Sequence, residues 1–322
     1  MTALPLRIRI FGRLLAASSV AKLDEAGLLK VQHRKVPHNA LTDRIFGSLA
    51  SGVDVQDGVV AGAEGTLAVR AYYPAASAGD DLPVVVNFHG GGFCLGSLDQ
   101  SDWICSRVAL GANVAVVSVD YRLAPAHRFP AAVEDCYAAL CDVVARATEF
   151  GIDPQRVAVM GDSAGGNLSA VVALLARDRS GPKPAFQVLL YPVTDQTNSS
   201  PSVRENRNAP ILTEADIRAF ARHYLADHDP KDPRVSPLFA ETHRDLPPAL
   251  IQVAEHDPIR DDGVRYAEAL RAAGVPVKLT TYDGMPHGYL AFPGVCRSAR
   301  PALAEICREL RTAFAEGYPS AT

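Results

Sequence analysis

The pattern that most constrains the fold is an alternation of short apolar runs with amphipathic stretches, which begins near residue 66 and continues toward the C-terminus. Most of the apolar runs are rich in valine and nearly continuous, as is typical of strands buried on both faces of a sheet. These predicted strands cover residues 84–88, 114–119, 157–160, 188–191, 250–253 and 277–282. Residues 66–73 precede the alternation and are expected to add antiparallel strands at one edge of the sheet.

Between the predicted strands, apolar residues recur at intervals of three and four, which predicts helices with one buried face. The three clearest stripes are Val133, Tyr137, Leu140 and Val144, then Leu168, Val171, Val172 and Leu175, and finally Leu303, Ile306, Leu310 and Phe314. A helix that connects two parallel strands makes a right-handed crossover. We therefore predict an α/β fold with a mostly parallel central sheet and helices on both faces.

Two segments do not fit this alternation. Residues 1–50 have a helical pattern with an apolar stripe at Leu4, Ile8, Phe11 and Leu15. Residues 195–245 combine polar turns and prolines with one short helix, which has Thr213 as its expected N-cap and Ile217, Phe220 and Tyr224 on one face. An insertion of this length often forms a lid or a binding surface, and we expect the two stripes to pack together. The alternative is a surface excursion without a role.

Composition and charge exclude several classes of protein. Of the 322 residues, 48% are hydrophobic and 21% are charged, as in an ordinary globular chain and unlike a disordered one. The 32 Lys and Arg residues against 36 Asp and Glu residues give a net charge of −4, which argues against nucleic acid as a partner. No run of about 18 uncharged apolar residues occurs, so we expect no stable membrane insertion.

Cysteine usage and the N-terminal residues bear on the compartment. The six cysteines are scattered without a CxxC pair or zinc-ligand spacing, so we predict free thiols in a reducing compartment. The N-terminal arginines and the apolar stretch beside them resemble a signal peptide only weakly, because Arg13 interrupts the apolar stretch. We therefore expect a cytoplasmic protein.

The residues that point to chemistry begin where the strand at 157–160 ends. The run Gly161-Asp162-Ser163-Ala164-Gly165-Gly166 follows it directly, and a helical stripe comes next. This is the G-x-S-x-G pattern in a strand–turn–helix context, in which a sharp turn exposes the serine oxygen at the carboxyl edge of the sheet. Ser163 is therefore the candidate nucleophile, and a plain glycine-rich turn is the alternative.

A second glycine-rich segment, His89-Gly90-Gly91-Gly92-Phe93, follows the strand at 84–88. Consecutive glycines let backbone N–H groups approach a substrate oxygen without obstruction by side chains. The alternative is a phosphate-binding loop, but the Lys-Ser/Thr of a P-loop and the spacing of a dinucleotide-binding loop are missing. We expect His89 to anchor this loop rather than to act as a base.

An activated serine needs a base, and the base needs an acid that orients it. Among nine histidines we choose His287, because it lies in the loop after the last predicted strand. Asp257 is the first acid after the strand at 250–253, whereas Asp261 and Asp262 lie further on, where Asp262 is placed to cap the next helix. The chain order serine, acid, histidine is the order found in α/β-hydrolases.

Five blocks together resemble the hormone-sensitive-lipase family of α/β-hydrolases, which contains the bacterial family IV carboxylesterases. They are His89-Gly90-Gly91-Gly92-Phe93, Asp120-Tyr121-Arg122-Leu123-Ala124-Pro125, Gly161-Asp162-Ser163-Ala164-Gly165-Gly166-Asn167, Asp257-Pro258-Ile259-Arg260-Asp261-Asp262-Gly263 and His287-Gly288-Tyr289. By this resemblance, Ser163, Asp257 and His287 form a catalytic triad. The backbone N–H groups of Gly91, Gly92 and Ala164 form the oxyanion hole.

The resemblance also implies an organisation and an activity. Residues 51–194 and 246–322 are expected to form an α/β-hydrolase domain, with residues 1–50 and 195–245 as a helical cap. The implied activity is that of a serine carboxylesterase for small esters of short- to medium-chain acids, without a metal or organic cofactor. An amidase, deacetylase or acyl transferase with the same triad is the alternative, and a receptor-like binding protein is another. Dimers joined through a sheet edge occur in the family, so homodimerisation is a further expectation.

The chain departs from the family pattern at two positions. Ala126 stands where glutamate is usual, and Tyr289 stands where phenylalanine is usual. Neither position has a catalytic role in the family. The cap, which sets substrate choice, is the least similar region.

Overall fold

A computed structural model describes residues 2–32, 39–77 and 81–315 of the chain. Its strands are β1 Val53–Ala61, β2 Thr66–Pro74, β3 Leu82–Phe88, β4 Ala115–Val119, β5 Ile152–Asp162, β6 Phe186–Leu190, β7 Ala249–His256 and β8 Val277–Pro286. Its α-helices are α1 Leu6–Leu15, α2 Glu25–Gln32, α3 Ala40–Phe46, α4 Leu98–Ala112, α5 Ala131–Ala145, α6 Ala147–Phe150, α7 Ala164–Asp178, α8 Pro201–Glu205, α9 Glu214–Leu225, α10 Arg260–Ala272 and α11 Ala299–Ala315. Short 3-10 helices include η1 Ala16–Ser18, η2 Val20–Lys22 and η5 Tyr289–Ala291.

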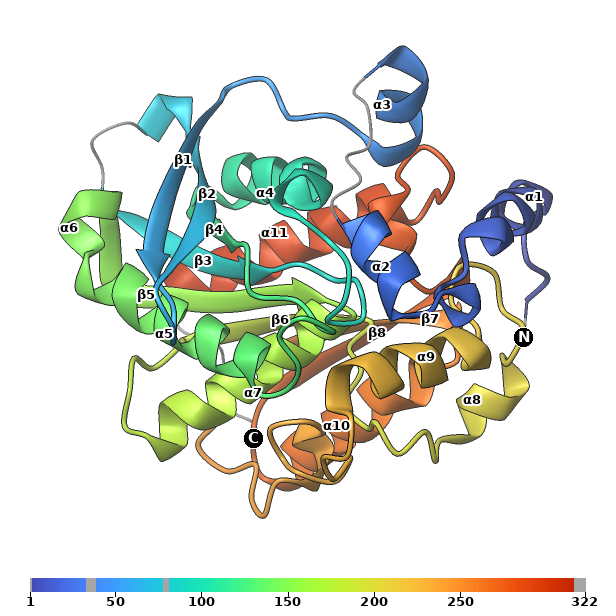
Figure 1. Cartoon of the computed structure of the whole chain (residues 1–322). Coiled ribbons are helices and arrows are strands. Elements are labelled where there is room, and N and C mark those ends of the chain that lie inside the picture. The colour runs from blue at the N-terminus through green and yellow to red at the C-terminus, as the bar shows by residue number, and fades with distance from the viewer. Residues whose placement is uncertain (1, 33–38, 78–80, 316–322) are drawn as a thin grey trace.

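The eight strands form one sheet in the order β1-β2-β4-β3-β5-β6-β7-β8 (Figure 1). β2 pairs antiparallel with both β1 and β4, and all the other neighbouring strands are parallel. The predicted α/β fold is therefore confirmed, and each of the six predicted core strands is present. The β-strand at 66–73 is also present as β2.

Strand β1 is the one strand that the sequence pattern did not predict. Seven of its nine residues are exposed, because it lies at the edge of the sheet and pairs only with β2. Apolar periodicity reports burial, so an exposed edge strand leaves almost no such signal. The central strands β3, β4 and β6 are buried along their whole length, and their patterns were correspondingly clear.

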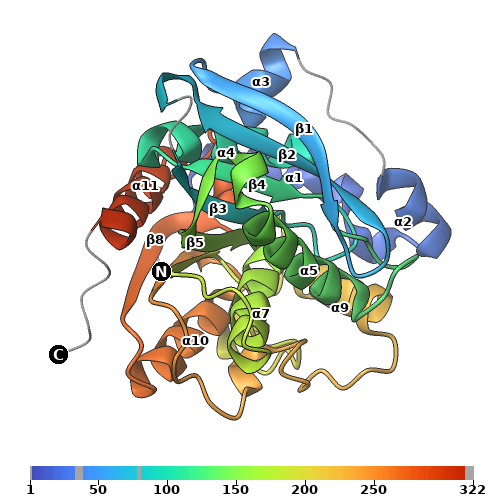
Figure 2. The same cartoon turned by 90° about the vertical axis from the view of Figure 1, so that its left-hand side faces the viewer.

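Helices cover both faces of the sheet (Figure 2). Helices α4 and α11 pack on one face, where their apolar side chains share a core with Met160 and Val188. Helices α5 and α7 pack on the other face, where Leu140 and Leu168 contact Val159 within a second core. This two-sided cover leaves the carboxyl ends of the parallel strands as the open edge on which a site can form.

Helix α10 packs beside α7 on β6 and β7, and five other helices lie over the open edge. They come from the N-terminal segment, as α1, α2 and α3, and from the insertion, as α8 and α9. Helix α9 begins at a capping box, in which Thr213 Oγ1 accepts the N–H of Asp216 at 3.1 Å, so the predicted N-cap is confirmed. One contact between the two segments lies at the start of η2, where Ser19 Oγ and the Ala21 N–H both donate to the Asp216 carboxylate.

The expected packing of the N-terminal stripe on α9 is wrong. Ile8 is fully buried in the core beside α11, and Phe11 packs edge-on against Phe292 at 4.9 Å between ring centroids. Ile217 and Phe220 face a different apolar cluster, and Tyr224 stacks on Phe93 at 3.9 Å. Helical spacing identifies which face of a helix is buried, but it does not identify the surface that covers that face.

The structure also bears on the expectations about membrane insertion and about the cysteines. Within the residues that the structure describes, none of the helices combines the length and the apolar character needed to cross a bilayer. All six cysteines lie in this part of the chain, and each is a free thiol.

Candidate active site

Ser163 lies at the sharp turn between β5 and α7. Its backbone has φ 55° and ψ −114°, a strained conformation that a residue with a side chain adopts only where the surrounding structure enforces it. The turn is tight because Gly165 packs against the end of β3, where a Cβ atom would collide with the carbonyl oxygen of Phe88. The Ser163 N–H donates to the Leu190 carbonyl at 2.8 Å and holds the turn against the sheet. The side chain therefore stands at the carboxyl edge, half-buried.

The loops after β7 and β8 bring Asp257 and His287 to the same edge. His287 Nε2 lies 2.8 Å from Ser163 Oγ, and His287 Nδ1 lies 2.7 Å from Asp257 Oδ2. Asp257 is fully buried, and its other oxygen, Oδ1, accepts the N–H of Ile259 at 2.9 Å. In the tautomer with the ring proton on Nδ1, Nδ1 donates to the Asp257 carboxylate and Nε2 accepts the hydroxyl of Ser163.

The glycine-rich loop after β3 forms the opposite side of the site. Gly91 has φ 124° and Gly92 has φ 61°, and a Cβ atom on Gly92 would collide with the ring of Phe220. Neither N–H donates to an acceptor among the described residues. Ala164 is the first residue of α7, so its N–H also has no acceptor within the helix. The three N–H groups are thus available to a substrate oxygen.

Asp162 and His89 support this loop. The Gly90 N–H donates to Asp162 Oδ1 at 2.7 Å; burial raises the pKa of Asp162, and this hydrogen bond opposes the rise. His89 is fully buried, with its ring stacked on Tyr121 at 4.4 Å and its Nδ1 at 2.9 Å from the Gly90 carbonyl. Burial lowers the pKa of His89, which favours a neutral ring. None of these contacts involves Ser163.

Two neighbouring cavities border the site. The smaller, of about 200 Å³, is bounded by Ser163, His287 and the glycine-rich loop. Its apolar wall includes Val193, Ile211, Leu212, Ile217, Phe220 and Ile259. The larger, of about 630 Å³, lies between the N-terminal segment and α4, and shares Gln100, Ala291 and Phe292 with the smaller one. Ser163 therefore opens on an apolar space that is partly enclosed by the insertion.

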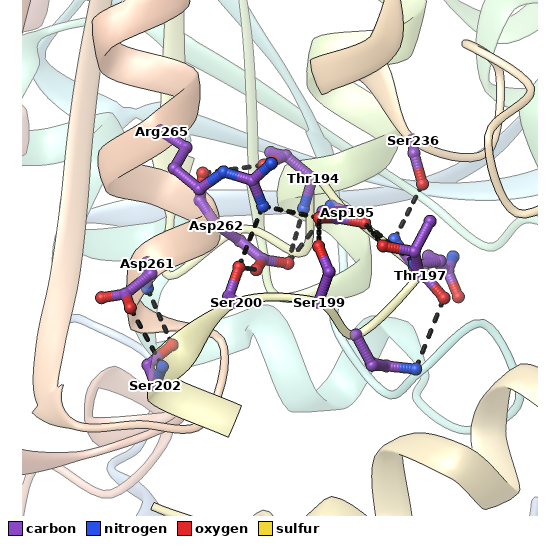
Figure 3. Close-up of polar contacts among 12 residues, drawn as sticks. Thr194, Asp195, Thr197, Ser199, Ser200, Ser202, Ser236, Asp261, Asp262 and Arg265 are labelled. Carbon is purple, nitrogen blue, oxygen red and sulfur yellow. Dashed lines mark hydrogen bonds and ion pairs between the residues drawn. The ribbon is translucent and has the colours of Figure 1, made fainter. Parts of the chain in front are cut away.

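A buried polar network joins the insertion to the first turns of α10, the helix that follows Asp257 in the chain (Figure 3). Asp262, which is 1% exposed, accepts the N–H groups of Thr194 and Asp195 at 3.3 and 3.2 Å and the hydroxyl of Ser200 at 3.0 Å. Asp261 accepts the Ser202 N–H at 3.0 Å. Of the three acids after β7, only Asp257 contacts His287. The expected capping role of Asp262 is wrong, because α10 begins at Arg260 and Ile259 occupies the N-cap.

Asp195 is a second buried carboxylate in this network. It receives Arg265 Nη1 at 2.6 Å and the Ser199 hydroxyl at 2.8 Å. Burial alone would raise the pKa of Asp195, but the hydrogen bonds from Thr197, Arg265 and Ser199 hold it below its ordinary value. Burial, together with the nearby charge of Asp195, raises the pKa of Asp262 well above its ordinary value. Arg265 thus pairs directly with Asp195, and it is linked to Asp262 only through Ser200, whose hydroxyl accepts Arg265 Nη1 at 3.1 Å.

The other candidate ligands and bases lie elsewhere. His243 Nε2 lies 2.9 Å from the Pro237 carbonyl, and His228 packs on Phe129 with ring centroids 5.0 Å apart. His33 and His38 lie outside the described residues. Across residues 2–32, 39–77 and 81–315, no group of three or more His, Cys, Asp or Glu side chains is arranged to hold a metal ion.

Several residues of the site carry no motif in the sequence. Phe292 lines both cavities and contacts Phe11 and Phe46, with ring centroids 4.9 and 5.6 Å apart. Phe220 was visible only as one member of a helical stripe. The departure at Tyr289 has a local reason, because its buried hydroxyl donates to Gln252 Oε1 at 3.2 Å. A single sequence contains no signal for contacts of this kind.

Known proteins resemble the chain over most of its length. A profile of the alpha/beta hydrolase fold family matches residues 85–291. Esterase LipI of Mycobacterium tuberculosis is 47% identical over 252 residues, which are 77% of this chain and 78% of that protein. Carboxylesterase NlhH of the same organism is 45% identical over 290 residues, or 89% and 83% of the two chains. The structure of an ester hydrolase from the Lake Arreo metagenome, bound to a bipyridine phosphonate derivative, superposes with a TM-score of 0.88 at 34% identity and covers 97% of this chain and 99% of that one.

Proposed function

The chain belongs to the hormone-sensitive-lipase family of α/β-hydrolases and is a carboxylic ester hydrolase, and from this premise we propose that it cleaves small esters of short- to medium-chain acids through an acyl-enzyme on Ser163. The observation that carries this proposal is the hydrogen-bonded series Asp257–His287–Ser163 at the base of an apolar cavity. Residues 51–194 and 246–322 supply this series and form the catalytic domain. Residues 1–50 and 195–245 form the cap.

In the first half of the reaction, Ser163 Oγ attacks the ester carbonyl carbon while His287 Nε2 takes the hydroxyl proton. Asp257 keeps the proton of the neutral imidazole on Nδ1 and stabilises the imidazolium that forms. The carbonyl oxygen becomes an oxyanion, which receives hydrogen bonds from the N–H groups of Gly91, Gly92 and Ala164. Such preformed donors act strongly because they face the developing charge and need no reorganisation during the reaction.

In the second half, the tetrahedral intermediate collapses and its carbon–oxygen bond to the alcohol breaks. His287 gives its proton to the departing alkoxide, so the alcohol leaves and the acyl group remains on Ser163. Water then attacks the acyl carbon, with His287 Nε2 again as the base. Release of the acid returns the proton to Ser163 and restores the enzyme.

A partition experiment tests the acyl-enzyme directly. Hydrolysis of p-nitrophenyl acetate and phenyl acetate is run with methanol as a second acceptor, and methyl acetate and acetate are quantified. A shared acetyl-enzyme requires the same product ratio from both esters, because the leaving group has departed before the acceptor attacks. Ratios that differ between the two esters would contradict the proposal. Acetanilide as a third substrate measures amidase activity, and the methyl acetate yield measures acyl transfer.

The small cavity predicts a preference for acyl length. Each buried methylene contributes up to about 0.8 kcal/mol, or about fourfold in kcat/KM, until the chain meets the cavity wall. We expect kcat/KM for p-nitrophenyl esters to peak at short or medium chains and to fall steeply toward palmitate. In Phe220→Ala, which removes part of the wall, the peak should move to longer chains. Phe150→Ala is the matched control, since Phe150 lies in α6 away from both cavities, and it should leave the profile unchanged. A maximum at palmitate in the wild type would contradict this account.

The proposed chemistry also predicts independence of metal ions. Ser163 activated by His287 supplies the nucleophile, and backbone N–H groups supply the electrophilic assistance, so no step needs a Lewis acid. Turnover of p-nitrophenyl acetate should therefore be the same before and after exhaustive dialysis against a chelator. A loss of turnover that a specific divalent ion restores would overturn this expectation.

A further inference from the structure

Helix α1 carries an apolar stripe on its outer face as well as on its inner face. Leu6, Ile10 and Leu14 follow one another at four-residue intervals and are 67%, 52% and 70% exposed. Large apolar side chains exposed singly are ordinary, but three in register on one helix face form a continuous strip. Helix α1 lies at the edge of the molecule (Figure 1), and the exposed fractions of the three side chains show that no described element covers this strip.

The inner face of α1 makes contacts that fix the position of the helix and the direction of the outer strip. Ile8 is fully buried, Gly12 packs closely against Pro210 of the insertion, and Phe11 contacts Phe292. The helix is thus held on one side by the core and the insertion, and rotation to bury the outer strip would expose these contacts. The strip is therefore a lasting feature of the surface.

Arginine residues border the strip on both sides. A helix turns by about 100° per residue, which places Arg13 and Arg9 along one border and Arg7 along the other. Arg9 and Arg13 are exposed and make no ion pair with a described residue, and α1 contains no acidic residue. A helix with an apolar face flanked by unpaired cations has the character of one that lies in the interface of an anionic membrane.

We propose that the outer face of α1 docks on an anionic phospholipid bilayer, with Leu6, Ile10 and Leu14 in the acyl boundary and Arg9 and Arg13 at the lipid phosphates. A second copy of this chain fits the strip less well, because a two-fold contact would bring the arginines of both copies together without an acid between them. With ten residues, α1 is about 15 Å long, so it lies on the bilayer and does not span it.

Docking in this way would place the larger cavity beside the lipid. Helix α1 continues into η1, and Ala17 of η1 lines that cavity together with Val20 and Leu23. Phe292, which packs on Phe11 of α1, lines both cavities. The proposed lipid binding goes beyond the proposed esterase function. It does not depend on that function, because lipid binding is measured without substrate turnover.

Co-sedimentation with vesicles tests the proposal. The full-length protein is mixed with vesicles of phosphatidylcholine alone and with vesicles that also contain phosphatidylglycerol. We expect binding only to the anionic vesicles, and we expect it to weaken at high salt, because the arginines act through screened charge. Absence of binding to the anionic vesicles, or equal binding to both kinds, would overturn the proposal.

Three variants identify the surface. Leu6→Gln/Ile10→Gln/Leu14→Gln should abolish binding, and Arg9→Gln/Arg13→Gln should weaken it about tenfold or more. Val55→Gln/Val59→Gln is the matched control on β1 at the opposite side of the molecule, where the two valines are 37% and 54% exposed, and it should bind as the wild type does. Hydrolysis of p-nitrophenyl acetate by each variant verifies the fold. Unchanged vesicle binding in the triple glutamine variant would overturn the proposal. It would also be overturned if the wild type bound no lipid but formed a dimer, and the triple glutamine variant were a monomer.

Discussion

Ser163→Ala is expected to lower kcat for ester hydrolysis by at least about three orders of magnitude while the protein remains folded. The substitution removes the oxygen that lies 2.8 Å from His287 Nε2, and no other hydroxyl occupies that position. The backbone of the turn is held by the Leu190 carbonyl and by the packing of Gly165, neither of which involves the hydroxyl. Circular dichroism and steady-state kinetics with p-nitrophenyl acetate measure the two parts of this prediction.

The matched control for this substitution is Ser77→Ala. Ser77 donates its hydroxyl to Asn113 Oδ1 at 2.8 Å, away from the two cavities, and its loss should change kcat by less than about twofold. Near-normal hydrolysis by well-folded Ser163→Ala would show that Ser163 is not the nucleophile.

Asp257→Asn is expected to lower kcat by about three to four orders of magnitude. The amide cannot hold the imidazole with its proton on Nδ1, so Nε2 no longer accepts the serine proton. Asparagine nearly matches aspartate in shape and keeps an oxygen for the Ile259 N–H, so the loop should remain in place. The loss should therefore fall on kcat, with KM changed little, and the unfolding temperature should be close to that of the wild type.

Substitutions of the two neighbouring acids, Asp261 and Asp262, distinguish a catalytic role from a structural one. Asp261→Asn should leave turnover within about tenfold, because Asp261 binds the Ser202 N–H and not His287. Asp262→Asn should lower the free energy of unfolding by about 1–3 kcal/mol, because the buried carboxylate accepts three hydrogen bonds, from Thr194 and from Asp195 and Ser200 of the insertion. If either substitution reduced kcat of folded protein more than Asp257→Asn does, another acid would be the partner of His287.

The sequence predicts those parts of the molecule that depend on local chemistry. A buried strand must be apolar along its length, and a nucleophile at a strand–helix turn requires small neighbours, so β5 and the Gly161–Gly165 turn are both visible in the chain. Asp257 and His287 were chosen because each follows a predicted strand, and the structure brings them together because β7 and β8 are adjacent and parallel. Parallel strands end at the same edge, which converts chain order into spatial proximity.

The sequence does not predict contacts between segments that are distant along the chain. The inner stripe of α1 could be recognised, but its partner Phe292 lies in a loop without periodicity. The serines that donate to Asp262 and Asp195 look like ordinary turn residues in the sequence. They become hydrogen-bond donors to buried carboxylates only when the insertion is folded. Strand β1 was not predicted for a different reason. It is exposed at the edge of the sheet, so it lacks the apolar pattern that marks a buried strand.

The most direct test of the central proposal is labelling with a fluorophosphonate, followed by peptide mapping with mass spectrometry. Attack by an activated serine expels fluoride and leaves a stable phosphonate ester, so the label reports the nucleophile itself. We predict one label per chain, located on Ser163, with loss of ester hydrolysis in proportion to labelling. Ser163→Ala should take up no label, and Asp257→Asn should take it up far more slowly. A label on any other residue, or an active enzyme that resists the probe, would contradict the assignment of Ser163 as the nucleophile.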